Sequence, residues 1–140
     1  VGDGPARAAL AAANPDFVFC GVQRGDALAE HFASGDLFVF PSLTETFGNV
    51  TLEAMASGIA TVAYRYGAAR EHLVDGAHGA AITNGDEQAF VTAVCELAQE
   101  PWRCLQRGQA ARAAIERLSP QSVSEHFADL LQSLRWRSAA

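Results

Sequence analysis

Residues 45–53 read Glu45-Thr46-Phe47-Gly48-Asn49-Val50-Thr51-Leu52-Glu53, and they join an apolar, strand-like run to an amphipathic helix. Glu45 is expected at the carboxyl end of the strand, where open α/β sheets bind ligands, and Glu53 about one turn inside the helix. Because helical side chains lean toward the N-terminus of their helix, Glu53 would point back at the loop. Two carboxylates would then flank free backbone N–H groups, which suits a ligand with hydroxyls at its ends and phosphate in its middle, such as a nucleotide sugar.

The start of this helix is suited to binding phosphate. The first turn of a helix presents unpaired N–H groups and about half a positive charge. Gly48 lets the ligand approach the backbone closely. Carboxylates would repel a phosphate, so Glu45 and Glu53 should bind neutral groups that donate hydrogen bonds, such as sugar hydroxyls. We therefore assign one acid to each of two sugars.

Apolar runs on both sides of this stretch predict a parallel sheet. They are continuous rather than alternating, which is typical of strands buried on both faces. The expected strands are 17–21, 36–41, 59–64 and 79–83. The expected helices are 5–13, 26–33 capped by Asp26, 49–57, 67–73, 84–99, 102–118 and one from Ser119 onward. The predicted fold class is α/β, a doubly wound, Rossmann-like parallel sheet sandwiched by helices.

Length and composition narrow the class of protein. With 140 residues, 49% of them hydrophobic, we expect residues 1–140 to form a single well-buried domain. The net charge is −6, and the ten basic residues are all arginine, which argues against nucleic-acid binding. No apolar run approaches the roughly 18 residues of a membrane span. We therefore expect a cytoplasmic protein.

Cysteine and histidine give no sign of a metal site. Cys20, Cys95 and Cys104 form no CxxC pair, and the four histidines have no metal-binding spacing. We expect ordinary thiols and neither a metal nor another cofactor.

The longer stretch around the two glutamates carries a family resemblance. It reads Pro41-Ser42-Leu43-Thr44-Glu45-Thr46-Phe47-Gly48-Asn49-Val50-Thr51-Leu52-Glu53-Ala54-Met55-Ala56-Ser57-Gly58. This stretch resembles the signature of retaining glycosyltransferases of the GT-B fold, the group 1 or family 4 type. Other landmarks of that family fall on Val1-Gly2-Asp3-Gly4-Pro5, Phe19-Cys20-Gly21, Phe38-Val39-Phe40-Pro41-Ser42 and Gly67-Ala68-Ala69-Arg70-Glu71. The resemblance covers almost the whole chain and implies the C-terminal, donor-binding domain of such an enzyme.

The resemblance also implies roles for individual residues. Glu45, the candidate catalytic residue, would contact the transferred hexose, and Glu53 would bind the ribose of a nucleoside-diphosphate sugar. The backbone around Val22 would line the base. The amides that would face the sugar and diphosphate are those of Phe47, Gly48, Asn49 and Val50. Catalysis would rest on positioning and electrostatic help to the departing diphosphate, with Glu45 orienting the sugar.

The sequence also departs from the family pattern. Thr61 replaces a proline, and Ala68 replaces the second glycine of a Gly-Gly turn. The family holds the diphosphate with an arginine and a lysine near the first strand of this domain, and the chain has no lysine. We therefore expect that pair, the first strand and the N-terminal acceptor domain to lie upstream of Val1.

Such a truncated domain should transfer no sugar alone and should bind nucleoside diphosphates weakly, at best in the millimolar range. Self-association of the fragment and peripheral membrane contact through the missing domain are left open.

Four other functions remain open from the residues. A sugar-nucleotide epimerase or a phosphorylase would use similar carboxylate contacts. A non-catalytic flavodoxin-like or receiver-like module would share the strand and helix pattern. A glycoside hydrolase would need its two carboxyl groups about 5 to 9.5 Å apart across a sugar cleft.

Overall fold

The computed structural model describes residues 1–137. They form two compact units, one of residues 1–35 and one that begins at Asp36. The single donor-binding domain expected from the sequence stays a prediction.

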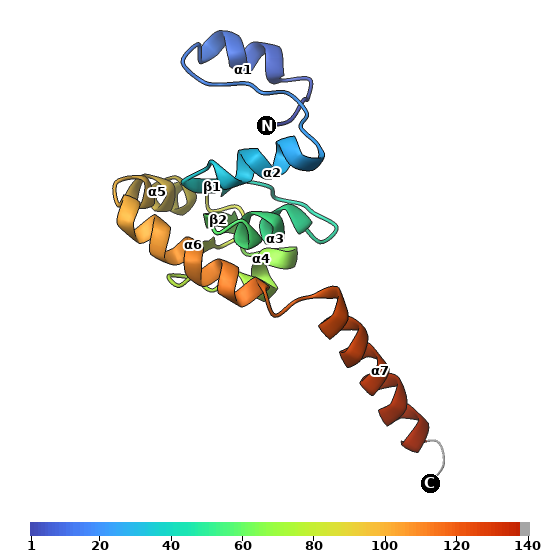
Figure 1. Cartoon of the computed structure of the whole chain (residues 1–140). Helices are drawn as coiled ribbons and strands as arrows, with labels where there is room; N and C mark the ends of the chain where they lie inside the picture. Colours follow the sequence, from blue (N-terminus) through green and yellow to red (C-terminus); the bar gives the residue numbers. More distant parts are fainter. Residues whose placement is uncertain (138–140) are drawn as a thin grey trace. The chain divides into compact units, whose positions relative to one another are not determined.

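The second unit is built on a three-stranded parallel sheet (Figure 1). Its strands are β1 (Leu37–Phe40), β2 (Ala60–Tyr64) and β3 (Gly79–Ile82), in the order β1-β2-β3. Leu37 pairs with Ala60 and Thr61 with Gly79. These strands confirm the predictions at 36–41, 59–64 and 79–83. Because all three run in one direction, their carboxyl ends meet at one edge of the sheet.

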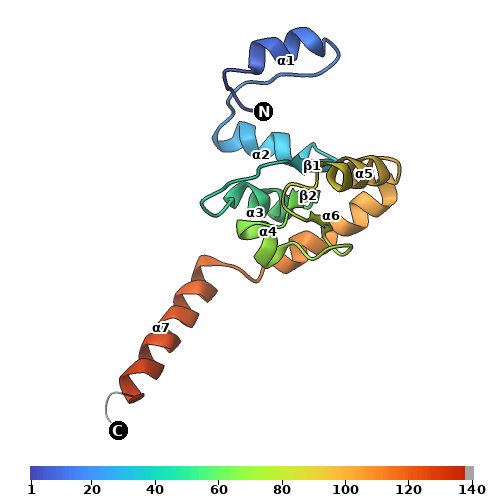
Figure 2. The ribbon, with the colours of Figure 1, turned by 180° about the vertical axis from the view of Figure 1, so that it is seen from behind.

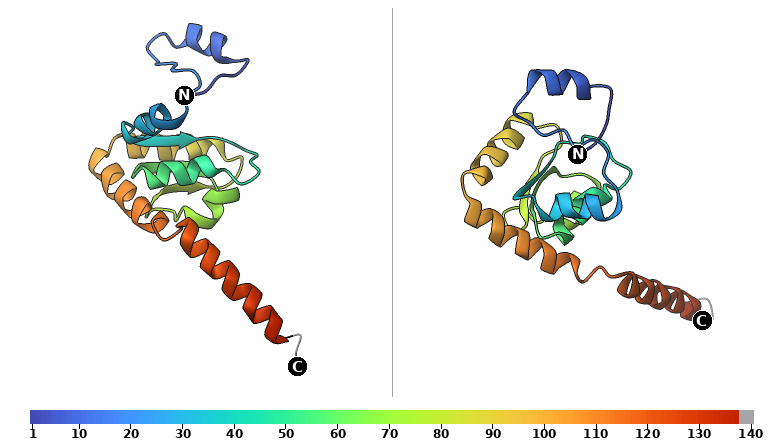
Figure 3. Two further views of the ribbon diagram at one scale, coloured as in Figure 1. Left: turned by 45° about the vertical axis from the view of Figure 1, so that its right-hand side comes forward. Right: turned by 45° about the horizontal axis from the view of Figure 1, so that its top comes forward.

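Helices cover both faces of this sheet (Figures 2 and 3). On one face, Val62 and Tyr64 pack against α5 (Glu87–Ala98), where the rings of Tyr64 and Phe90 lie 4.8 Å apart between centroids. On the other face, Ala63 packs with residues of α3 (Asn49–Ala56) and α4 (Gly67–His72). All five residues of β2 are buried. The alternation of side chains along a strand therefore fills two separate cores, as predicted for a doubly wound sheet.

The helix α6 (Pro101–Ile115) contributes to both cores, with Cys104 on one face and Ala111 on the other. It can do so because Gly108 is buried against the turn that precedes β2. A Cβ atom at Gly108 would lie only 2.0 Å from the carbonyl oxygen of Gly58.

The last helix is α7 (Pro120–Arg137), and its start is capped as predicted, because Ser119 Oγ accepts a hydrogen bond from the Ser122 amide at 3.1 Å. Of the helices within residues 1–137, none combines the length and the apolar character needed to cross a bilayer.

The first unit holds α1 (Arg7–Ala13) and α2 (Gly25–Ala33). The strand predicted at 17–21 is wrong. Phe17 and Val18 are 68% and 85% exposed, and the segment is tied to residues 1–5 by a backbone hydrogen bond from Gly2 to Gly21. An apolar run becomes a strand only when a neighbouring strand supplies a ladder of such bonds, and one bond is no ladder.

The cap predicted for α2 is also corrected. Its N-cap is Arg24, and Asp26 lies within the first turn without capping it.

Candidate functional site

The loop between β1 and α3 carries Glu45 in a fixed orientation. Glu45 is half-buried, and its Oε1 accepts a hydrogen bond of 2.7 Å from the hydroxyl of Ser42. The Ser42 hydroxyl also lies 3.2 Å from the carbonyl oxygen of Thr44. Within residues 1–137, Oε2 of Glu45 has no hydrogen-bond partner and remains able to accept a bond from a ligand.

Gly48 makes the turn into α3. It is the N-cap, with φ +86° and ψ +49°, in the left-handed region that glycine adopts without a steric penalty. A Cβ atom there would lie 3.5 Å from Cγ of Glu45, an ordinary contact. Backbone conformation, rather than lack of room, therefore requires glycine here.

The first turn of α3 leaves its amides free. The Thr51 amide bonds to the carbonyl of Gly48 at 3.0 Å, and no side chain caps the helix. The amides of Gly48, Asn49 and Val50 donate to no acceptor within residues 1–137, as expected for the start of a helix. Free N–H groups directly beside a held carboxylate can receive phosphate oxygens.

Glu53 lies one turn into the same helix, as predicted. Its side chain is exposed, and no described residue pairs with its carboxylate. The carboxylate is therefore available to a ligand. Glu45, Gly48 and Glu53 thus lie in one loop and the helix that follows it.

Phe47 is attached to the helix after β2. Its carbonyl accepts a hydrogen bond of 2.6 Å from the Ala68 amide, and its ring meets the His72 ring edge-on, with 6.4 Å between centroids. The sequence analysis missed His72, because nothing in its spacing marks it. Ser42 was missed as well, although a hydroxyl residue three positions before an acid in a loop is a usable signal.

Two charged residues that follow β2, Arg65 and Glu71, contact neighbouring residues of the sheet and of α4. The amide of Arg65 bonds to the Ile82 carbonyl at 2.7 Å, and its guanidinium donates to the Ala81 carbonyl at 3.2 Å, so Arg65 ties β2 to β3. Glu71 Oε2 lies 3.9 Å from His72 Nε2. Within residues 1–137, no three His, Cys, Asp or Glu side chains gather into a metal-binding cluster.

Val22 belongs to the first unit, where it is 56% exposed. Its part in lining the base stays a prediction.

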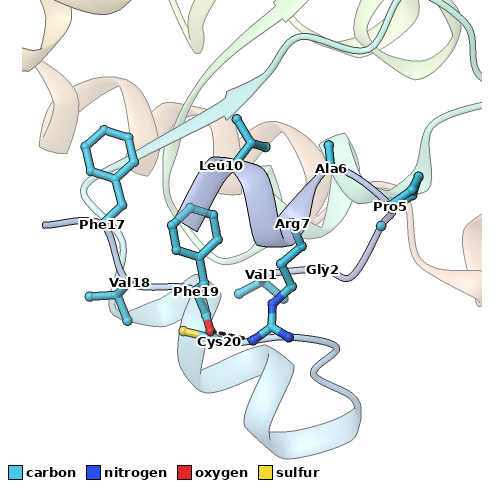
Figure 4. Close-up of a pocket in the computed structure, with 11 residues that line it drawn as sticks. Val1, Gly2, Pro5, Ala6, Arg7, Leu10, Phe17, Val18, Phe19 and Cys20 are labelled. Atoms are coloured by element: carbon cyan, nitrogen blue, oxygen red, sulfur yellow. Dashed lines mark hydrogen bonds between the residues drawn. The ribbon is translucent and has the colours of Figure 1, made fainter. Parts of the chain in front are cut away.

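The first unit has a hollow of its own, of about 340 Å³, between α1 and residues 17–20 (Figure 4). Its described lining is mostly apolar. The guanidinium of Arg7 donates to the Phe19 carbonyl at 3.2 Å and lies 3.9 Å from a carboxylate oxygen of Asp3. We find no catalytic arrangement in its described lining.

The loop and sheet define a class of α/β proteins that bind ligands at the carboxyl ends of parallel strands. The chain belongs to the family described as "Glycosyl transferases group 1", whose profile matches residues 1–100.

Two curated relatives illustrate the match. The sulfoquinovosyl transferase SQD2 of Arabidopsis thaliana is 37% identical over 122 residues, which are 84% of this chain and 24% of the relative. A GDP-mannose-dependent alpha-mannosyltransferase of Mycolicibacterium smegmatis is 40% identical over 116 residues, 82% of this chain and 30% of the relative. The chain therefore spans less than a third of either protein.

Solved structures agree with the fold. Sucrose-phosphate synthase from Thermosynechococcus elongatus superposes with a TM-score of 0.77 at 22% identity, over 96% of this chain and 34% of that one. Anabaena Alr3699/HepE in complex with UDP-glucose gives 0.69 at 26% identity, over 82% of this chain and 32% of that one. The predicted Rossmann-like, GT-B fold class is confirmed.

Proposed function

We propose that this chain is the donor-binding part of a retaining glycosyltransferase, which transfers a hexose from a nucleoside-diphosphate sugar to an acceptor. The observation that carries the proposal is a carboxylate held by Ser42, at the carboxyl edge of the sheet, beside the free amides of α3. The names of the relatives support it, since one depends on GDP-mannose and a similar structure was solved with UDP-glucose.

Each group at the site has a role in this proposal. Oε2 of Glu45 accepts a hydroxyl of the hexose, while Ser42 holds the other oxygen and fixes the angle of the carboxylate. The amides of Gly48, Asn49 and Val50 bind the diphosphate, with the positive end of the α3 dipole behind them. The carboxylate of Glu53 accepts the ribose hydroxyls.

The reaction is then helped by fixed position and fixed charge. Hydrogen-bond donors already aimed at the diphosphate stabilise the charge that grows on it as its bond to the sugar breaks. In this proposal the site needs no metal ion. The acceptor site is assigned to the part of such an enzyme that corresponds to the remaining length of its relatives.

Backbone NMR of the labelled chain tests the donor site. UDP-glucose and GDP-mannose are titrated into it separately at millimolar concentrations. We expect amide shifts concentrated between residues 45 and 53 with at least one of the two. Glu45→Gln should weaken binding of the nucleoside-diphosphate hexose and leave binding of the nucleoside diphosphate without a hexose unchanged. Shifts spread over the surface, or centred on the hollow beside α1, would overturn the proposal.

A further inference from the structure

The loop of residues 41–48, between β1 and α3, is called the donor loop below. Helix α4 is attached to this loop at two points, both on Phe47. The Ala68 amide donates to the main-chain carbonyl of Phe47 at 2.6 Å. The half-buried ring of His72 meets the Phe47 ring at an interplanar angle of 75°. Phe47 is therefore held through its main chain and its side chain by one helix.

The turn before Ala68 permits this attachment only with glycine. Gly67 has φ +49°, and a Cβ atom there would lie 2.3 Å from the Phe47 carbonyl oxygen. Backbone atoms cannot yield by that amount without moving the loop. The close approach of α4 to Phe47 is thus a specific feature of the fold.

The far end of α4 is held as well. Nδ1 of His78 lies 3.2 Å from the Val74 amide nitrogen and 3.1 Å from the carbonyl oxygen of His72. Without a proton this nitrogen accepts from Val74, and with a proton it donates to His72, so it makes one of the two hydrogen bonds at a time. In either tautomer the His78 ring is hydrogen-bonded to the main chain at the end of α4, at His72 or at Val74. The imidazole of His72 is therefore presented to Phe47 from a backbone that is itself anchored.

The donor loop is consequently pinned on both sides of Glu45. Ser42 holds the Glu45 carboxylate, and α4 holds Phe47, the residue directly before the left-handed Gly48. The direction of the free amides at the start of α3 follows from where Phe47 is held. Amides fixed in advance bind an anion without the cost of ordering the loop.

We infer that Gly67 and His72 are positioning residues of the donor site, acting through Phe47 on the amides that receive the diphosphate. This inference rests on the proposed function for its ligand. Its structural part, the link from His72 through Phe47, also stands in the protein without ligand.

Titration with UDP, followed by NMR, tests the role of His72 in binding. His72→Ala should weaken the binding of UDP roughly three- to tenfold, which is the range expected when an edge-on contact between two aromatic rings is lost. His72→Phe keeps that contact and should restore binding to within about twofold. His126→Ala, in exposed α7, is the matched control and should bind as the wild-type chain does.

A double-mutant cycle tests the route. Because His72 is inferred to act through the Phe47 ring, Phe47→Ala combined with His72→Ala should bind UDP no more weakly than Phe47→Ala alone. Additive losses would overturn the inference. So would His72→Phe binding as weakly as His72→Ala, or His72→Ala binding as tightly as the wild type.

Amide hydrogen exchange of Ala68 supplies a second readout without ligand. This amide is protected by the Phe47 carbonyl, so His72→Ala should speed its exchange, and His72→Phe and His126→Ala should not. If wild-type protein fails to bind any nucleoside diphosphate, the proposed function fails and this exchange alone decides. Unchanged exchange in His72→Ala would then overturn the inference, and faster exchange would support it.

Discussion

The hydroxyl of Ser42 and the carboxylate of Glu45, three positions apart in the loop after β1, are joined by a 2.7 Å hydrogen bond. Both side chains are half-buried. Hydrogen bonds to a charged group are shorter and stronger than neutral ones, and this bond selects one orientation of the carboxylate. The second oxygen of Glu45 is thereby aimed rather than free to rotate.

Removing the Ser42 hydroxyl should weaken binding of the hexose part of the donor and leave binding of the nucleotide part unchanged. UDP-glucose and GDP-mannose are tested, and whichever binds the wild-type chain is used. Ser42→Ala should weaken its binding about three- to tenfold. This corresponds to a loss of roughly 1 kcal/mol of binding free energy, because the Glu45 carboxylate is no longer held in one orientation. Calorimetry on UDP or GDP alone should show no change. Ser124→Ala on α7, which removes a hydroxyl bonded to a backbone carbonyl, is the control. An equal loss for both ligands would show that Ser42 supports the loop as a whole.

The second acid, Glu53, should bind the ribose hydroxyls of the nucleotide. We expect Glu53→Gln to weaken the binding of a nucleoside diphosphate by roughly tenfold to a hundredfold, because a hydrogen bond to a charged acceptor contributes roughly 1.5 to 3 kcal/mol. A dideoxy nucleoside diphosphate should bind wild type and variant equally. Glu96→Gln, an exposed acid on α5, is the control. If Glu53→Gln prefers the nucleoside diphosphate over its dideoxy form by the same affinity ratio as the wild type, Glu53 does not bind the ribose.

The sequence predicted the second unit because its signals were local. A continuous apolar run at 59–64 meant a strand buried on both faces, and the structure buries all of β2. The run at 17–21 looked the same and is not a strand. Whether an apolar run joins a sheet depends on the neighbour it finds, which a single sequence does not display.

The site divides in the same way. Glu45, Gly48 and the start of α3 could be located from turn and helix-start signals. The contact of His72 with Phe47 could not, because it joins residues 25 positions apart through the packing of α4. Ser42 lies between these cases, near in sequence but with a hydroxyl direction that only the folded loop determines.

Two glycines with positive φ should respond differently to alanine. Gly76→Ala, at φ +75° with open space around it, should lower the free energy of unfolding by about 1 to 2 kcal/mol from backbone strain alone. Gly67→Ala adds a Cβ atom 2.3 Å from the Phe47 carbonyl, so it should cost clearly more and shift the amide resonance of Ala68. Urea unfolding of both variants measures the difference. If both variants lose the same free energy of unfolding, the loop that contains Phe47 moves away from the added Cβ atom without destabilising the fold.

Gly108 sets helix propensity against packing. Alanine is favoured over glycine inside a helix by about 1 kcal/mol, so Gly108→Ala would stabilise an exposed helix. Here the added Cβ atom would lie 2.0 Å from the Gly58 carbonyl oxygen, and α6 would have to move away from the turn before β2. Overpacking of this kind typically costs about 1 to 3 kcal/mol. We expect net destabilisation in urea, whereas a stabilised variant would show that α6 can shift freely.

The buried thiol of Cys104 should resist modification. Cys104 is 4% exposed, and its Sγ donates to the Leu97 carbonyl at 3.2 Å. Burial raises the pKa of this thiol, with Asp36 and Glu100 adding to the rise and Arg107 opposing it. Since the thiolate is the reactive form, iodoacetamide at mildly alkaline pH should label exposed Cys95 and leave Cys104 intact. In denaturant both should react, and peptide mass mapping distinguishes them.

The same shift predicts a dependence of stability on pH. Because the folded pKa lies above the unfolded value of about 8.5, the unfolded state loses its proton first as the pH rises. The contribution of Cys104 to stability is complete below that pH and is lost progressively as the pH rises through the folded pKa. Urea unfolding between neutral and strongly alkaline pH should therefore show a steeper decline for the wild-type chain than for Cys104→Ala. Cys95→Ala should follow the wild type, and parallel curves for wild type and Cys104→Ala would contradict the raised pKa.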